Sequence, residues 1–217
     1  MCDRSVDIRE YNIYIVFMNP ELKDIIDMEV GPVRTTALCE WIQNLYPDNE
    51  DKPVLVGGSA VELYTGGAYI TGDMDFVGIV PPVVEKKLRI SGFVKKGRHW
   101  IHEGGKLYIE FPGDGLTGGD EALEVLIGDH SIIIISPEDI IVDRLSAWLF
   151  WRSLVDGVNA FLLYRAQYEA FDHNRLKDRA QVAEVTGALN AVKNLHKKFP
   201  DALPSKEALE QWTLKAI

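Results

Sequence analysis

Two glycines followed by two aspartates form the segment of this chain whose residue types and spacing could do chemistry. Gly57 and Gly58 come after the apolar run 54–56 and before a stretch with helical spacing. A strand, a tight turn and a helix in this order leave backbone N–H groups free at the helix N-terminus, where they can receive phosphate oxygens. The pattern predicts phosphate contacts at Gly57, Gly58 and the following Ser59. Ser59 also suits the N-cap position of a helix that runs to Tyr64.

Asp73 and Asp75 open the next apolar run, which continues to position 80. Side chains two positions apart on a strand point the same way, so a strand over 73–80 would carry both carboxylates on one face. The continuous apolar run indicates a strand covered on both faces, and two crowded carboxylates at its start would repel each other without a cation. Carboxylate oxygens with no Cys or His cluster nearby favour Mg²⁺ or Mn²⁺ over zinc. The pair therefore predicts a divalent-metal site, although surface strands also carry acids at alternate positions.

A third acid, Glu110, belongs to the run 107–111, in which apolar residues alternate with Tyr108 and Glu110. On a strand, Tyr108 and Glu110 would share the polar face. We expect this face to meet the aspartates.

The glycine pair, serine, short helix and Asp-x-Asp strand resemble the nucleotidyltransferase fold of the DNA polymerase beta superfamily, in its small prokaryotic forms. These forms include the minimal nucleotidyltransferases and the abortive-infection toxin nucleotidyltransferases. The likeness covers about Arg34 to Arg179, and its specific part is the glycine pair with Asp-x-Asp fifteen positions after Gly58. It implies that the glycine turn holds the triphosphate of an NTP, and that three carboxylates hold two Mg²⁺ ions while a hydroxyl displaces pyrophosphate. Carried over residue by residue, phosphate would contact Gly57, Gly58 and Ser59, and metal would bind Asp73, Asp75 and Glu110.

Two departures from the relatives bear on activity. Several relatives carry an arginine two residues before the threonine of the Asp-x-Asp segment, where this chain has Tyr69. The third acid is Glu110 where aspartate is more usual, so its longer side chain must be accommodated.

Beyond this motif, the helix expected from Pro137 onward carries Asp143, Arg144 and Arg152. Arg144 or Arg152 could assist the triphosphate. An ion pair within the helix explains the same residues, and we give the two interpretations equal weight. The helix also carries three large aromatic residues, which we expect in the core or against the sheet rather than in base stacking: Trp148, Phe150 and Trp151.

Strands followed by mostly segregated helices indicate an α+β fold, in which a nucleotidyltransferase-type mixed sheet flanked by helices occupies residues 1–136. A helical C-terminal region packed on this core occupies residues 137–217. The expected elements are helices over 33–45, 59–64 and 83–90; strands over 54–56, 73–80 and 131–136; a hairpin of 98–101 and 106–111 around the turn 102–105; and helices from 137 and over about 154–168, 174–195 with a break near Gly187, and 205–216. The run 11–18 could be a strand or a short helix.

Composition describes an ordinary globular protein. The chain has 217 residues, 47% hydrophobic and 26% charged, with a net charge of −10. That charge argues against a general nucleic-acid coat, because such proteins neutralise many phosphates with Lys and Arg. Two cysteines form neither a disulfide framework nor a metal knuckle, so we expect a reduced cytoplasm. No run approaches the ~20 apolar residues of a membrane span.

Three functions explain the motif to different degrees. The leading hypothesis is a Mg²⁺-dependent nucleotidyltransferase that moves a nucleoside monophosphate from an NTP to a hydroxyl on a small molecule, RNA or protein. The alternative is a noncatalytic nucleotidyltransferase-like module that binds nucleotide or a protein, for instance in a toxin–antitoxin system; Tyr69 favours it, whereas the three acids favour the enzyme. A glycosyltransferase would share the aspartates but leaves Gly57 and Gly58 unexplained. We also consider a homodimer through the tryptophan-rich helices.

Overall fold

The computed structural model describes residues 21–116, 118–200 and 202–216, so the run 11–18 lies outside the described residues. Within them the chain forms an α+β structure, in which helices flank one mixed sheet. The expected fold class is confirmed. In the same ranges, no helix combines the length and apolar character needed to cross a membrane.

Seven strands form the sheet: β1 Val54–Val56, β2 Met74–Val77, β3 Val94–Lys96, β4 His99–His102, β5 Leu107–Gly113, β6 Ala122–Ile127 and β7 His130–Ile135. Their order across the sheet is β3-β4-β5-β2-β1-β7-β6. Strand β1 is antiparallel to the central strand β2 and parallel to β7, and β2 is parallel to β5. The two strands that carry acids, β2 and β5, are therefore neighbours.

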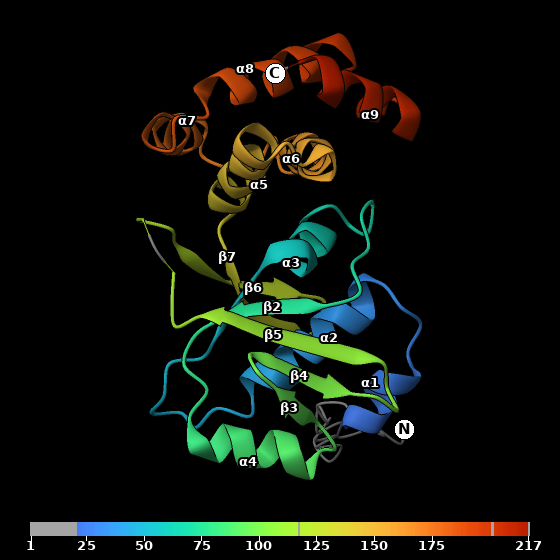
Figure 1. Ribbon diagram of the computed structural model, residues 1–217, viewed down its shortest axis with the longest axis vertical. Coiled ribbons are helices and arrows are strands. Elements are labelled where there is room, and N and C mark those ends of the chain that lie inside the picture. The colour runs from blue at the N-terminus through green and yellow to red at the C-terminus, as the bar shows by residue number, and fades with distance from the viewer. Residues whose placement is uncertain (1–20, 117, 201, 217) are drawn as a thin grey trace, which may run out of the picture.

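The described helices are α1 Leu22–Asp27, α2 Pro32–Gln43, α3 Gly57–Tyr64, α4 Pro82–Ile90, α5 Pro137–Trp151, α6 Leu154–Ala166, α7 His173–Val182, α8 Thr186–Lys198 and α9 Lys206–Lys215. Figure 1 shows α5 to α9 stacked at one end of the molecule, with α3 between them and the sheet. Helix α4 lies at the other end, beside β3. Helix α3, which follows the glycine pair, thus connects the sheet to the helical region.

A buried amide joins α2 to the sheet. The Gln43 side chain donates to the carbonyls of Pro53 at 2.8 Å and Ile133 at 2.7 Å, and it accepts from the Ile133 N–H at 2.9 Å. Each buried polar group of the amide is therefore satisfied, which is the condition for placing it there without a large cost. This contact fixes α2 against the strands that lead to the glycine turn.

Helix α5 begins where the sequence predicts. Pro137 occupies the first turn, and the Ser136 hydroxyl accepts a hydrogen bond from the Asp139 N–H at 3.2 Å. The buried Asp139 carboxylate accepts from Arg175 and from Arg179, both at 2.7 Å. These ion pairs attach α7 to the start of α5, so the helical region is anchored next to β7.

The aromatic residues of α5 divide into two groups. Trp148 is fully buried, with its ring 4.9 Å from that of Trp212, and its indole N–H donates to the Thr213 carbonyl. Phe150 and Trp151, by contrast, are 57% and 82% exposed, so their expected place in the core is wrong. Side chains two positions apart on a helix differ by a rotation of about 200° around its axis, so Phe150 points away from the face that carries Trp148. Trp151 is the last helical residue, beyond the packed turns.

Several element boundaries differ from expectation because single residues leave the regular backbone conformation. The strand expected over 73–80 runs only from Met74 to Val77, so Asp73 lies before it and its expected place on the strand is wrong. At the other end, Gly78 adopts φ 150°, where the strand stops. The helix break expected near Gly187 lies earlier, where Glu184 adopts φ 61° before α8 begins. The edge strands β3 and β6 were not expected at all.

The expected hairpin is confirmed, but its register is shifted. Lys106 adopts φ 50° and belongs to the turn, so His102 pairs with Leu107. As a result His99 stands directly opposite Glu110. This shift decides which side chains surround the third acid.

Candidate functional site

The glycine turn brings the backbone against an aspartate. Val56 pairs with Asp75 across the sheet, and α3 starts at the next residue, Gly57. Gly57 adopts φ 64°, and a Cβ there would lie 2.1 Å from the Asp75 Oδ2 atom. Only glycine satisfies both conditions. The Asp75 carboxylate also accepts a hydrogen bond from the Gly58 backbone N–H, and it thereby lies at the N-terminus of α3.

Glu110 lies beside Asp75, because the parallel pairing of β2 with β5 places these two residues in register. Its carboxylate is already engaged by the hairpin. The Arg98 Nε atom lies 2.5 Å from Glu110 Oε1, and the His99 Nδ1 atom lies 3.5 Å from Oε2. The expected approach of Glu110 to the aspartate strand is therefore present, together with a cationic partner that was not expected.

Asp73 lies in the bend just before β2. Its Oδ1 atom accepts from the Thr71 hydroxyl at 2.8 Å, and its carbonyl accepts from the Ser59 hydroxyl at 2.8 Å. Ser59 itself is completely buried and lies inside α3, whose N-cap is Val56, so the expected N-cap at Ser59 is wrong. The positive φ of Gly57 starts the helix two residues earlier. With its hydroxyl engaged, the Ser59 side chain positions Asp73, and the phosphate contact expected of Ser59 stays a prediction.

A buried carboxylate on α3 supports this bend. Glu62 is 1% exposed, and its two carboxylate oxygens accept from the Thr35 hydroxyl at 2.8 Å and from the Thr71 N–H at 3.1 Å. Thr71 in turn donates to Asp73. The chain of contacts from α2 through Glu62 to Thr71 therefore fixes the loop that presents Asp73.

The electrostatics of the site are unbalanced toward negative charge. Burial, followed by the charges of Asp73 and Glu110, raises the pKa of the Asp75 carboxyl from 3.8 to about 6. The hydrogen bond from Gly58 and the charge of Arg144 act in the opposite direction but do not offset this rise. A carboxylate held in this way is stabilised by an added cation.

A divalent cation fits the chemistry of these carboxylates, although they do not form a complete set of metal ligands in this structure. Asp73 and Asp75 offer hard oxygen donors, and Glu110 is the neighbouring third acid. Among the described residues, however, no group of three or more His, Cys, Asp or Glu side chains converges closely enough to hold a metal ion. Asp75 and Glu110 lie in register on neighbouring strands, and Asp73 precedes Asp75 by two residues, so the three acids share one region. The Asp73 carboxylate accepts from Thr71, and the Glu110 carboxylate pairs with Arg98. To join the aspartates, Glu110 would have to release Arg98.

Arg144 faces the same region, but Arg152 does not. Arg144 lines a pocket of about 350 Å³, which we call the α5 pocket, together with Gly57, Asp75 and Glu110. Its guanidinium donates to the Asp143 carboxylate at 2.9 Å and to the Asp156 carboxylate at 2.7 Å. The expected ion pair is thus present, and the triphosphate role of Arg144 stays a prediction.

Arg152 is the exposed C-cap of α5 and is not among the residues that line the α5 pocket. Eight residues of helix separate it from Arg144, which is about 12 Å along the helix axis. Tyr69, at the position where the sequence resemblance implies an arginine, lines a different pocket of about 670 Å³ with α6 and α9. Neither residue contributes a cation to the acidic site.

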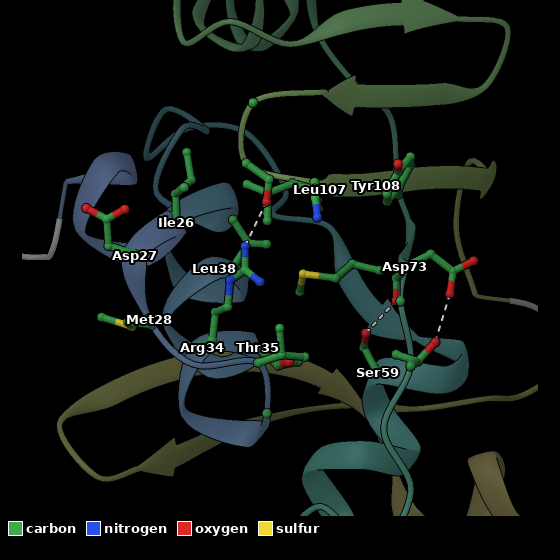
Figure 2. Close-up of a pocket in the computed structure, with 18 residues that line it drawn as sticks. Ile26, Asp27, Met28, Arg34, Thr35, Leu38, Ser59, Asp73, Leu107 and Tyr108 are labelled. Carbon is green, nitrogen blue, oxygen red and sulfur yellow. Dashed lines mark hydrogen bonds between the residues drawn. The ribbon is translucent and has the colours of Figure 1, made fainter.

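Another pocket adjoins the acidic site and is lined in part by Asp73. We call it the α2 pocket: it has a volume of about 500 Å³ and lies between α1, α2, the bend at residues 71–74 and the turn between β4 and β5. Figure 2 shows Arg34 on one side of this pocket and Asp73 with Ser59 on the other. Asp75 and Glu110 line the α5 pocket, and Asp73 lines the α2 pocket. Asp73 and Glu110 also line a third hollow of about 400 Å³ together with His99 and Tyr108.

Comparison with known proteins supports the fold. No protein-family model matches the chain, and no curated protein matches its sequence. The crystal structure of an antigenic nucleotidyltransferase-like protein from Paracoccidioides brasiliensis is similar to this structure with a TM-score of 0.52 and 19% sequence identity. The match covers 84% of this chain and 94% of that chain. The chain has a nucleotidyltransferase-like fold.

Sequence reasoning missed four residues that surround the acids. Arg98 and His99 contact Glu110 only because of the shifted hairpin register. Glu62 and Thr71 hold Asp73, and the one sequence signal for Glu62 is an acid within an otherwise apolar helix. That signal does not reveal its partners, which depend on how α2 docks.

Proposed function

We propose that this chain is a Mg²⁺-dependent nucleotidyltransferase of the DNA polymerase beta superfamily. The observation that carries the proposal is the contact of Gly57 with the Asp75 carboxylate at the N-terminus of α3, with Glu110 in register on the next strand. A fold of this kind, a phosphate-binding glycine turn and paired carboxylates at one edge are the parts that nucleotidyl transfer needs.

Each residue has a role in this proposal. The Gly57 and Gly58 backbone would receive the triphosphate oxygens, and Asp73, Asp75 and Glu110 would hold Mg²⁺. The bound cation would supply positive charge to the reacting phosphate and the leaving pyrophosphate. Arg144, which lines the α5 pocket, would face the nucleotide.

A second candidate is a noncatalytic nucleotide-binding or protein-binding module, as in a toxin–antitoxin system. The ion pair between Arg98 and Glu110 favours it, because a third acid neutralised by arginine is a poor metal ligand. Tyr69 also removes a cation that relatives carry. The two candidates differ in whether Glu110 can exchange Arg98 for metal.

Label transfer separates the candidates. The protein is incubated with each NTP labelled at the α-phosphate and Mg²⁺, alone and with cell extract, and label is followed into protein, RNA and small molecules. For the enzyme, label moves with the wild type and with the exposed control Asp51→Asn, but not with Asp75→Asn or after chelation. Absence of transfer under all conditions, with saturable NTP binding retained, supports the binding module instead.

A further inference from the structure

A nucleotidyltransferase has two substrates and needs a binding site for each, and the α2 pocket is separate from the α5 pocket. Nucleotidyl transfer joins an NTP to an acceptor, and both must reach the same carboxylates. The α5 pocket contains the glycine turn and Arg144, whereas the α2 pocket contains Asp73 but no part of the glycine turn. A volume of about 500 Å³ lies within the range of small-molecule sites.

Contacts within the chain fix the walls of the pocket. Gly105, in the turn between β4 and β5, approaches α1 so closely that a Cβ would lie 2.7 Å from the Ile26 side chain. The Gly105 carbonyl accepts from Arg34 Nη2 at 2.9 Å, and its N–H donates to His102 Nδ1 at 2.8 Å. The turn is thus fixed on α1 and α2, and Glu62 fixes the opposite wall through Thr71.

Two cations line this pocket. Arg34 makes its hydrogen bond within the described residues to a neutral carbonyl, and its buried Nε atom has no partner among them. Lys106 is exposed and holds φ 50° in a turn where two glycines precede it. A nonglycine residue in this conformation costs about 1 kcal/mol, which glycine would avoid. Lys106 thereby brings an ammonium group to the exposed side of the pocket, where it can contact an anionic ligand.

Two acidic residues, Asp27 and Asp73, also line the pocket. Asp27 lies at the exposed rim, and Asp73 lies at the end shared with the proposed metal site. A ligand that pairs with Arg34 and Lys106 would therefore carry its anionic group at one end. A hydroxyl at its other end would reach the region of Asp73, where Figure 2 places the opposite wall.

We infer that the α2 pocket binds the acceptor, a small molecule that carries an anionic group and a hydroxyl. This rests on the proposed nucleotidyl transfer and names the acceptor class for it. The hydroxyl oxygen forms a bond to the α-phosphorus of the NTP, the bond from that phosphorus to the pyrophosphate oxygen breaks, and the hydroxyl proton leaves to water. The anion is held by Arg34 and Lys106.

The test uses NMR of the full chain with three defined anions, namely inorganic phosphate, acetate and glycerol 3-phosphate, and with glycerol as the uncharged comparator. We expect saturable shifts of the backbone amides 104–107 and of Arg34 Nε–H with at least one anion, and none with glycerol. Arg34→Gln should weaken this binding about tenfold or more, and Lys106→Gly about fivefold. Lys86→Ala, on the exposed face of α4, should leave it unchanged.

Lys106→Gly also controls for folding, because glycine relieves the positive φ and its melting temperature should be no lower than that of the wild type. The inference is overturned if none of the anions shifts the amides 104–107, if both variants bind them normally, or if NTP with Mg²⁺ itself occupies this pocket. Failure of the proposed function looks different: NTP with Mg²⁺ then fails to shift Gly57 and Gly58, whatever the anions do.

Discussion

Replacement of Asp75 by asparagine should stabilise the metal-free protein, although it removes the residue most central to the site. In the folded state the pKa of Asp75 rises from 3.8 to about 6, first through burial and then through Asp73 and Glu110. Such a change corresponds to ~3 kcal/mol for a fully buried group. Because the carboxylate is partly exposed, solvent screening reduces the figure to ~1–2 kcal/mol. Asparagine keeps the oxygen that accepts from the Gly58 N–H, so this gain is not offset by a lost bond.

The pH dependence follows from the direction of that pKa. The folded state holds the Asp75 proton more tightly than the unfolded chain, so the free energy of unfolding of the wild type falls as pH rises from about 4 to about 6. The asparagine variant lacks this loss. Its advantage should be near zero below about pH 4 and complete above about pH 7, where it amounts to ~4 °C in melting temperature for a chain of this size.

The assay is thermal melting in chelator across this pH range, for wild type, Asp75→Asn and the exposed control Asp51→Asn. Addition of Mg²⁺ should raise the melting temperature of the wild type above pH 7 and leave Asp75→Asn unchanged. A variant less stable than the wild type at pH 8, or a gain that is the same at every pH, would refute the account of crowded carboxylates.

Three further predictions concern the residues around the acids. Gly57→Ala should lower the free energy of unfolding by ~2–3 kcal/mol in urea and abolish transfer, because the added Cβ would overlap the Asp75 carboxylate. Gly66 also has a positive φ, 61°, but open space around it. Gly66→Ala should therefore lose only the ~1 kcal/mol that a nonglycine residue costs at positive φ. Equal losses for both alanine variants would contradict the close approach. Glu62→Gln should cost ~1–2 kcal/mol in the same measurement, since an amide can accept from one of the two donors but not both, and it should lower the rate of transfer by displacing Asp73. An unchanged rate would show that Asp73 is held by other contacts. Arg98→Ala should reduce the Mg²⁺ concentration at half-maximal transfer, because it frees the third acid for metal, whereas Lys86→Ala should not. A weaker response to Mg²⁺ in Arg98→Ala would mean that the arginine helps to hold the site.

The local part of the site could be predicted from the sequence because it depends on short-range geometry. Gly57 and Gly58 follow an apolar run, and a strand has a period of two residues, so the positions of the turn and of Asp75 follow from spacing alone. The approach of Glu110 to Asp75 also followed, since both lie on strands of one expected sheet. The start of helix α5 was predictable because Pro137 suits the first turn of a helix.

The remainder depends on long-range docking that spacing does not encode. Arg98 reaches Glu110 only because Lys106 joins the turn and shifts the hairpin register. Glu62 acquires its partners from α2 and from the bend before β2, which are distant in the chain. Trp151 is exposed because α5 ends there, a fact of packing rather than of hydrophobic pattern.

The central claim is that this site moves a nucleoside monophosphate, and a paired-label experiment tests it most directly. Two samples of the same NTP, labelled at the α-phosphate or at the γ-phosphate, are incubated with the protein, Mg²⁺ and the small-molecule fraction of a cell extract. The account predicts that the α-label appears on an acceptor while the γ-label is released in pyrophosphate, and that both signals vanish with Asp75→Asn. Transfer of the γ-label to the acceptor, or its release as orthophosphate while the α-label stays in nucleotide, would contradict the account.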